Sequence, residues 1–203
     1  MTFIESLIST FQRGGLAMWP ILLLSVYGMT LIVERWQYYR RQGVLLREQW
    51  SRLESQGNSL EPQALTDGLA SIGARLTKAI CAQRGLEPTA QLDKVRSVFN
   101  DERALLEERL NIIAVIATLL PMLGLLGTVA GMIETFDVIA LHGTGSPNLM
   151  ASGISQMLVA TEAGLLTAIP ILYLHNALTR HADRLTRRLD EYATHLLQRC
   201  NQK

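Results

Sequence analysis

This chain of 203 residues contains few of the residue combinations from which catalytic or metal sites are built. Its 4 histidines are scattered without the spacing of metal ligands: His142, His175, His181 and His195. No serine or cysteine stands beside a base as a nucleophile, and the glycine-rich run 124–131 lacks the Lys-Ser/Thr pair of a phosphate-binding loop. We therefore expect no enzyme activity, no metal and no cofactor.

Charge is missing from two long stretches and nearly missing from a third. Leu16–Val33 and Leu110–Ile133 contain no charged residue, and Met150–Leu174 contains one, Glu162. A run of roughly 20 apolar residues matches the ~30 Å hydrocarbon core of a bilayer. The chain is too small to bury three such helices on all sides in a soluble core. The sequence therefore predicts three transmembrane helices.

The positive charges lie on one side of these predicted spans. Of 19 Lys and Arg, 12 lie between Arg35 and Arg109 and 6 lie after Asn176. The positive-inside rule then places the N-terminus outside and the C-terminus inside. Cys81 and Cys200 both fall inside, so we expect free thiols rather than a disulfide. The basic residues are not clustered with aromatic residues, which argues against nucleic-acid binding.

The predicted fold is an all-α membrane protein in which two of three transmembrane helices extend into a cytoplasmic helical bundle. Its segments are an amphipathic N-terminal segment (1–15), transmembrane helix 1 (16–34), a cytoplasmic helical region (35–110), transmembrane helix 2 (111–138), a periplasmic loop (139–149), transmembrane helix 3 (150–175) and a cytoplasmic C-terminal helix (176–203). No helix-breaking residue separates the last cytoplasmic helix from the second span, so one helix is expected from about Thr89 to about Val138.

Helical spacing of apolar residues predicts which faces are buried in the cytoplasmic region. Leu69, Ile72, Leu76 and Ile80 define one amphipathic helix. The C-terminal helix has a similar seam: Leu178, Ala182, Leu185, Leu189, Tyr192 and Leu196. Both patterns predict helices packed against other helices.

Glu162 stands at the midpoint of the third span. A carboxylate at that depth costs several kcal/mol against lipid, so it must face protein or water. Thr128 and Thr161 are expected at about the same depth, on either side of the loop. Gln156 and Glu162 are roughly 120° apart on the helix, so they cannot both face one narrow lumen. These four residues are candidates for a proton pathway; the alternative is a protonated Glu162 without a task and threonines bonded to their own helices.

Small residues recur at spacings of three and four residues in the second and third spans. They are Gly124, Gly127, Gly131, Ala160, Gly164 and Ala168. Such stripes let transmembrane helices approach closely, so we expect them at helix contacts.

Three runs of residues also carry a family resemblance. They are Met18–Ser25 leading to Glu34-Arg35, Leu123–Met132, and Ile154–Pro170 with its end Gly-Leu-Leu-Thr-Ala-Ile-Pro. Together with the order of the spans, they resemble the ExbB/TolQ/MotA proton-channel family over nearly the whole chain.

The resemblance implies a homopentamer around the single transmembrane helices of two ExbD/TolR-like partners, with a link to a TonB-like energy transducer. Protons would cross the inner membrane past an aspartate of the partner, and the resulting movement would deliver force to a periplasmic or outer-membrane target. It assigns Thr128 and Thr161 to the pore lining. The membrane glutamate of the ExbB and TolQ branches aligns with Gln156 and is thus absent, which leaves Glu162 as the only carboxylate of that span.

On this resemblance we expect an ExbB-like energiser of outer-membrane transport, ahead of a TolQ-like envelope subunit or another stator-type motor. The short cytoplasmic region argues against the flagellar branch. The alternative from another class is a non-conducting oligomeric membrane scaffold, in which the small-residue stripes serve assembly alone.

Overall fold

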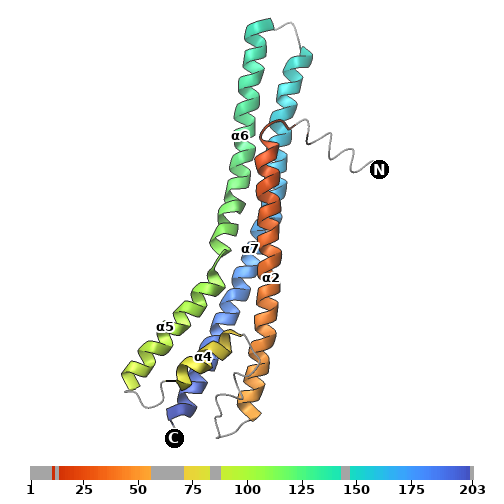
Figure 1. Cartoon of the computed structure of the whole chain (residues 1–203). Coiled ribbons are helices and arrows are strands. Elements are labelled where there is room, and N and C mark those ends of the chain that lie inside the picture. Colours follow the sequence, from red (N-terminus) through yellow and green to blue (C-terminus); the bar gives the residue numbers. More distant parts are fainter. Residues whose placement is uncertain (1–10, 12–13, 56–70, 83–87, 143–146, 202–203) are drawn as a thin grey trace. The chain divides into compact units, whose positions relative to one another are not determined.

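The computed structural model describes residues 11, 14–55, 71–82, 88–142 and 147–201, and all regular structure within these ranges is α-helical (Figure 1). The helices are α2 (Met18–Ser55), α4 (Ile72–Cys81), α5 (Pro88–Glu107), α6 (Leu110–His142) and α7 (Pro147–Asn201). The all-α class is confirmed, as are three helices long and apolar enough to cross a membrane. Most of the predicted amphipathic segment 1–15 lies outside the described residues.

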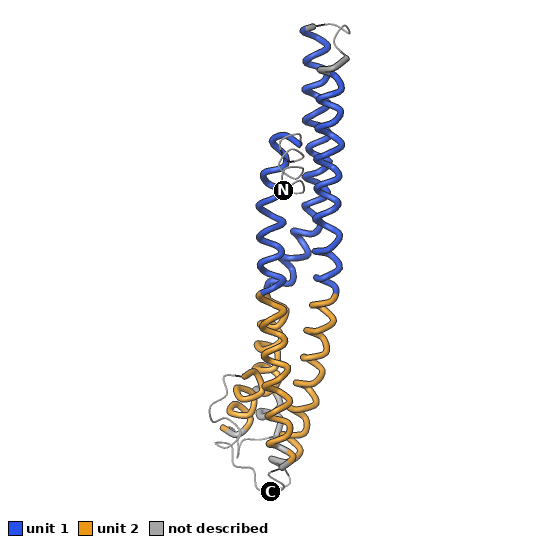
Figure 2. The backbone as a smooth tube through the Cα atoms, turned by 90° about the vertical axis from the view of Figure 1, so that its right-hand side faces the viewer, with its two compact units in different colours: residues 1–33, 109–176 blue, residues 34–108, 177–203 orange. Residues whose placement is uncertain are grey.

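The chain forms two compact units (Figure 2). Unit 1 contains residues 1–33 and 109–176, and unit 2 contains residues 34–108 and 177–203. Helices α2 and α7 each contribute one part to unit 1 and another to unit 2. Unit 1 therefore holds the three apolar runs, and unit 2 holds the amphipathic helices.

In unit 1, the first part of α2 packs on α6 and α7. A Cβ added to Gly28 would lie 3.1 Å from Ile116 of α6 and 3.3 Å from Ile171 of α7, so the three helices meet closely at this glycine. Many large apolar side chains on the remaining faces are exposed in the single chain, among them Leu23, Met122 and Leu166. Faces of this composition suit contact with lipid or with other apolar helices.

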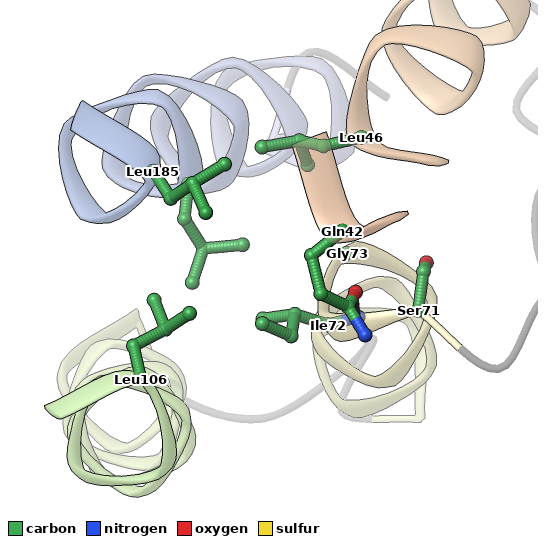
Figure 3. A pocket seen from close by; sticks show the side chains of 8 residues that line it. Gln42, Leu46, Ser71, Ile72, Gly73, Leu106 and Leu185 are labelled. Atoms are coloured by element: carbon green, nitrogen blue, oxygen red, sulfur yellow. Dashed lines mark hydrogen bonds between the residues drawn. The ribbon is translucent and has the colours of Figure 1, made fainter. Parts of the chain in front are cut away.

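Unit 2 is a bundle of four helical segments around an apolar centre. Figure 3 shows Ile72 of α4, Leu106 of α5 and Leu185 of α7 converging there, next to Gln42 and Leu46 of α2. The predicted seams are confirmed: Ile72, Leu76 and Ile80 are buried, and so is the whole C-terminal set from Leu178 to Leu196 named above. Leu69 lies outside the described residues.

Helix α4 is held by polar contacts on several sides. The side chain of Ser71 caps it by accepting from the amide of Ala74, and the backbone amide of Ile72 donates to Gln42. Arg75 forms a bidentate ion pair with the buried Glu102 of α5 at 2.5 Å. This hydrogen bonding raises the pKa of Arg75 above its ordinary value, although burial acts in the opposite direction. The pair fixes α4 on α5.

The expected single helix from Thr89 to Val138 is wrong, because the structure divides it into α5 and α6. Arg109 has a φ of 67°, in the left-handed region that interrupts an α-helix. The last carbonyls of α5 consequently lack intrahelical partners. Arg35 of α2 donates to the carbonyl of Leu105 at 3.1 Å, and the Tyr39 hydroxyl donates to that of Leu106 at 2.6 Å. Contacts from a distant part of the chain stabilise the break, so no local sequence signal announces it.

Candidate functional site

Helices α6 and α7 approach each other closely at the small residues of unit 1. A Cβ on Gly164 would lie 2.7 Å from the backbone oxygen of Leu120, and one on Gly127 would lie 2.5 Å from the Cβ of Ala160. Gly124 faces the backbone of the same segment of α7, with a Cβ position 3.1 Å from the oxygen of Ala160. Backbone lies against backbone here, so larger side chains do not fit.

This contact continues beyond the residues that were predicted. The site of a Cβ on Gly131 lies 2.6 Å from Met157, and Gly153 packs directly on the hydroxyl of Thr135. Thr135 is buried and donates to the carbonyl of Gly131 at 2.8 Å. Sequence reasoning missed Thr135 and Gly153. The four-residue spacing of Gly127, Gly131 and Thr135 was the signal that could have found the threonine.

The hydroxyls of the two candidate threonines bond to neighbouring carbonyls of α6. The Thr161 hydroxyl lies 3.3 Å from the carbonyl of Gly124 in α6 and 3.1 Å from that of Met157 in its own helix. The Thr128 hydroxyl donates to Leu125 within α6 at 2.6 Å. Gly124 and Leu125 are consecutive residues, about 1.5 Å apart along the helix axis, so the two hydroxyls lie at about the same depth along α6, as expected.

Glu162 is exposed in the single chain and forms no hydrogen bond or ion pair with the described residues. Its neighbours on α7, Ala160 and Gly164, are buried against α6. The carboxylate is therefore turned away from the α6–α7 contact, towards whatever surrounds this chain. Thr161 lies at the edge of the α6–α7 contact, because its side chain is half-buried and its hydroxyl bonds to the carbonyl of Gly124.

Gln156 of α7 points away from Glu162, and its side chain contacts the chain just before α2. Gly15, three residues before that helix, has a φ of 65°, and a Cβ there would collide with the amide nitrogen of Gln156. Gln156 thus contacts the chain entering α2. The structure brings Thr161 and Gly124 together, whereas Glu162 has no hydrogen bond to Gln156 or to Thr128. Ala168, the last of the predicted small residues, is buried.

Comparison with known proteins agrees with the motifs in these helices. Residues 57–191 match the profile of the MotA/TolQ/ExbB proton channel family. This chain is a member of that family. The biopolymer transport protein exbB1 of Vibrio cholerae is 30% identical to it, over 92% of this chain and 85% of that protein. An ExbB-like protein of Synechocystis is also 30% identical, over 83% of this chain and 69% of that protein.

The similar proteins include members of the TolQ branch as well as of the ExbB branch. The Tol-Pal system protein TolQ of Pseudomonas aeruginosa is 27% identical, over 68% of this chain and 61% of that protein. With its three apolar helices, the chain is a multi-pass inner-membrane protein of a family of proton-channel, stator-type subunits. Membership implies work in a complex with ExbD/TolR-like proteins.

Proposed function

We propose that this chain is an ExbB-like subunit of a motor driven by the proton-motive force, which energises outer-membrane transport. It lines a proton pathway around a single-span, ExbD-like partner that carries an intramembrane aspartate. The N-terminus is periplasmic and the C-terminus cytoplasmic, and five copies of the chain surround the partner. The ExbB assignment is supported by the broader coverage of the exbB1 relative, 92% of this chain against 68% for TolQ.

The observation that carries the proposal is the outward position of Glu162. It is the only charged side chain of the apolar run Met150–Leu174, and it is exposed on the single chain. A carboxylate facing lipid at this depth costs several kcal/mol, so an outward Glu162 requires protein or water on that face. A ring of subunits around a partner helix supplies such a face. Thr161 and Thr128 supply the neighbouring hydroxyls along this pathway, whereas Gln156 contacts Gly15 and faces the chain that enters α2 rather than the lumen that Glu162 faces.

The experiment is proton uptake into proteoliposomes that contain the chain and its co-purified partner. We expect Glu162→Gln to lower partner-dependent uptake by about a hundredfold, the low end of what a positioned proton-transferring group contributes. Glu134→Gln is the matched control, because Glu134 is an exposed carboxyl that follows the charge-free part of α6. Unchanged uptake in Glu162→Gln would contradict the proposal.

Native mass spectrometry of the complex tests the partner separately. Five copies with two single-span proteins that carry an intramembrane aspartate support the motor, and the partner's sequence separates an ExbB-like from a TolQ-like system. An oligomer without such a partner, in which Gly127→Leu disrupts assembly and Glu162→Gln changes nothing, would instead support a non-conducting scaffold.

A further inference from the structure

An open groove in unit 2 lies between α2 and α7, and it shares Leu46 with the apolar centre of that unit. Its volume is about 280 Å³. We call it the arginine groove, and it is lined by Gly43, Leu46, Arg47, Trp50, Arg188 and Glu191. One guanidinium comes from each helix, while Leu46 and Trp50 supply an apolar wall.

Both arginines of the groove are unpaired within the described part of the chain. Arg47 and Arg188 are exposed and have no ion pair or hydrogen bond there. Some arginines of unit 2 are paired over short distances, as Arg75 is with Glu102 and Arg103 is with Glu107, whereas Arg41 and Arg187 are exposed like those of the groove. A guanidinium presents a planar set of donors that fits a carboxylate or a phosphate. The groove therefore offers two free anion-binding groups on opposite walls.

The aromatic wall of the groove is held in place by neighbouring side chains. The indole nitrogen of Trp50 donates to Glu54 at 2.9 Å. Its ring packs edge-on against His195, with centroids 5.3 Å apart, and against Tyr192 at 5.9 Å. A fixed indole ring beside two guanidinium groups suits a ligand that has a flat part as well as an anionic one.

Gly43 leaves space in the groove that helix packing does not require. A Cβ at this position would lie 3.6 Å from Leu185, which is an ordinary contact. Glycine inside a helix is less stable than alanine, so its presence in the middle of α2 lacks a packing reason. By contrast, a Cβ on Gly73 would collide with Gln49. The open side of Gly43 is consistent with a place for a bound molecule.

The size of the groove limits what occupies it. A space of about 280 Å³ is close to the lower end of the size range of small-molecule pockets, so it admits a small soluble molecule.

We propose that the arginine groove binds a small soluble molecule with one phosphate or carboxylate group and a flat ring. The anionic group lies between Arg47 and Arg188, and the ring lies against Trp50. Glu191 accepts a hydrogen bond from a donor on the ligand and repels additional negative charge, so the groove favours a monophosphate over a triphosphate. This site is independent of the proposed proton pathway, because none of its residues lies in unit 1.

Isothermal titration calorimetry of AMP into the purified full-length protein in detergent tests the proposal without any flux measurement. We expect binding to the wild type, weakened at least about tenfold in Arg47→Ala and in Arg188→Ala, because each removes a charge-assisted hydrogen bond. Arg41→Ala and Arg187→Ala are matched controls, since both are exposed arginines outside the groove lining, and each should leave affinity unchanged. ATP should bind more weakly than AMP.

A second variant tests the groove itself with both arginines in place. Gly43→Leu fills the space and is expected to abolish AMP binding while the helical circular dichroism spectrum stays the same. The proposal is overturned if AMP does not bind the wild type at a few millimolar, if the control variants lose as much affinity as the groove variants, or if inorganic phosphate binds as tightly as AMP.

Discussion

Several single polar side chains of unit 2 are buried because they complete hydrogen bonds that a helix end leaves open. Arg35 and Tyr39 are both buried, and they bind the carbonyls of Leu105 and Leu106 where α5 ends. Arg35 also pairs with Glu108 at 3.3 Å. The ring of Tyr39 is buried in unit 2. Its hydroxyl bond was not predictable, because the acceptor lies 67 residues away.

Replacing Tyr39 with phenylalanine tests this capping role. The variant keeps the ring but leaves the buried carbonyl of Leu106 without its donor, so we expect a loss of about 1–3 kcal/mol in the free energy of unfolding. Titration with SDS, followed by circular dichroism, measures it. Tyr173→Phe is the control, because its ring is exposed and no bond of its hydroxyl is known within the described chain. An equal effect in both variants would exclude capping as the cause.

Among the helices, the contact between α6 and α7 combines what could and could not be predicted. The spacing of small residues correctly indicated a close approach. The exact contact, with the Thr161 hydroxyl bonded to the carbonyl of Gly124, depends on how two surfaces interlock and is not encoded in either stripe alone. Counting from the middle of the connecting loop placed the two hydroxyls at about the same depth, and their acceptors are the consecutive residues Gly124 and Leu125.

Two glycine-to-alanine changes separate packing from helix propensity. Gly164→Ala puts a methyl group 2.7 Å from the backbone oxygen of Leu120, so we expect α6 and α7 to be forced apart at a cost of about 1–3 kcal/mol. Gly43→Ala meets only ordinary contact with Leu185 and should stabilise the protein by about 0.5–1 kcal/mol. SDS titration of both variants measures the difference. Stabilisation by both would mean that the α6–α7 contact tolerates a side chain.

For the whole protein, the distribution of charge predicts one orientation in the membrane. Nearly all lysines and arginines lie in residues 35–109 or after residue 176. The positive-inside rule therefore places unit 2 in the cytoplasm and the connection between α6 and α7 in the periplasm.

Cysteine labelling of whole cells measures this orientation. In a background with Cys81→Ser and Cys200→Ser, Leu141→Cys should react with a membrane-impermeant maleimide that reaches the periplasm. Arg40→Cys should react only after the inner membrane is opened. Both side chains are exposed in the single chain, so burial within the chain does not explain a difference in their labelling. The reverse labelling pattern would invert the proposed topology.

The sequence by itself determined the helical class, the three apolar helices, the seams of unit 2 and the family. Each of these follows from local patterns, because charge-free length and periodic apolar residues act within one helix. Only the tertiary structure decided where α5 ends, how Thr161 is placed on α6, and that Glu162 faces outward while Gln156 contacts Gly15. These features depend on contacts between segments far apart in the chain, and such contacts leave no periodic trace in either segment.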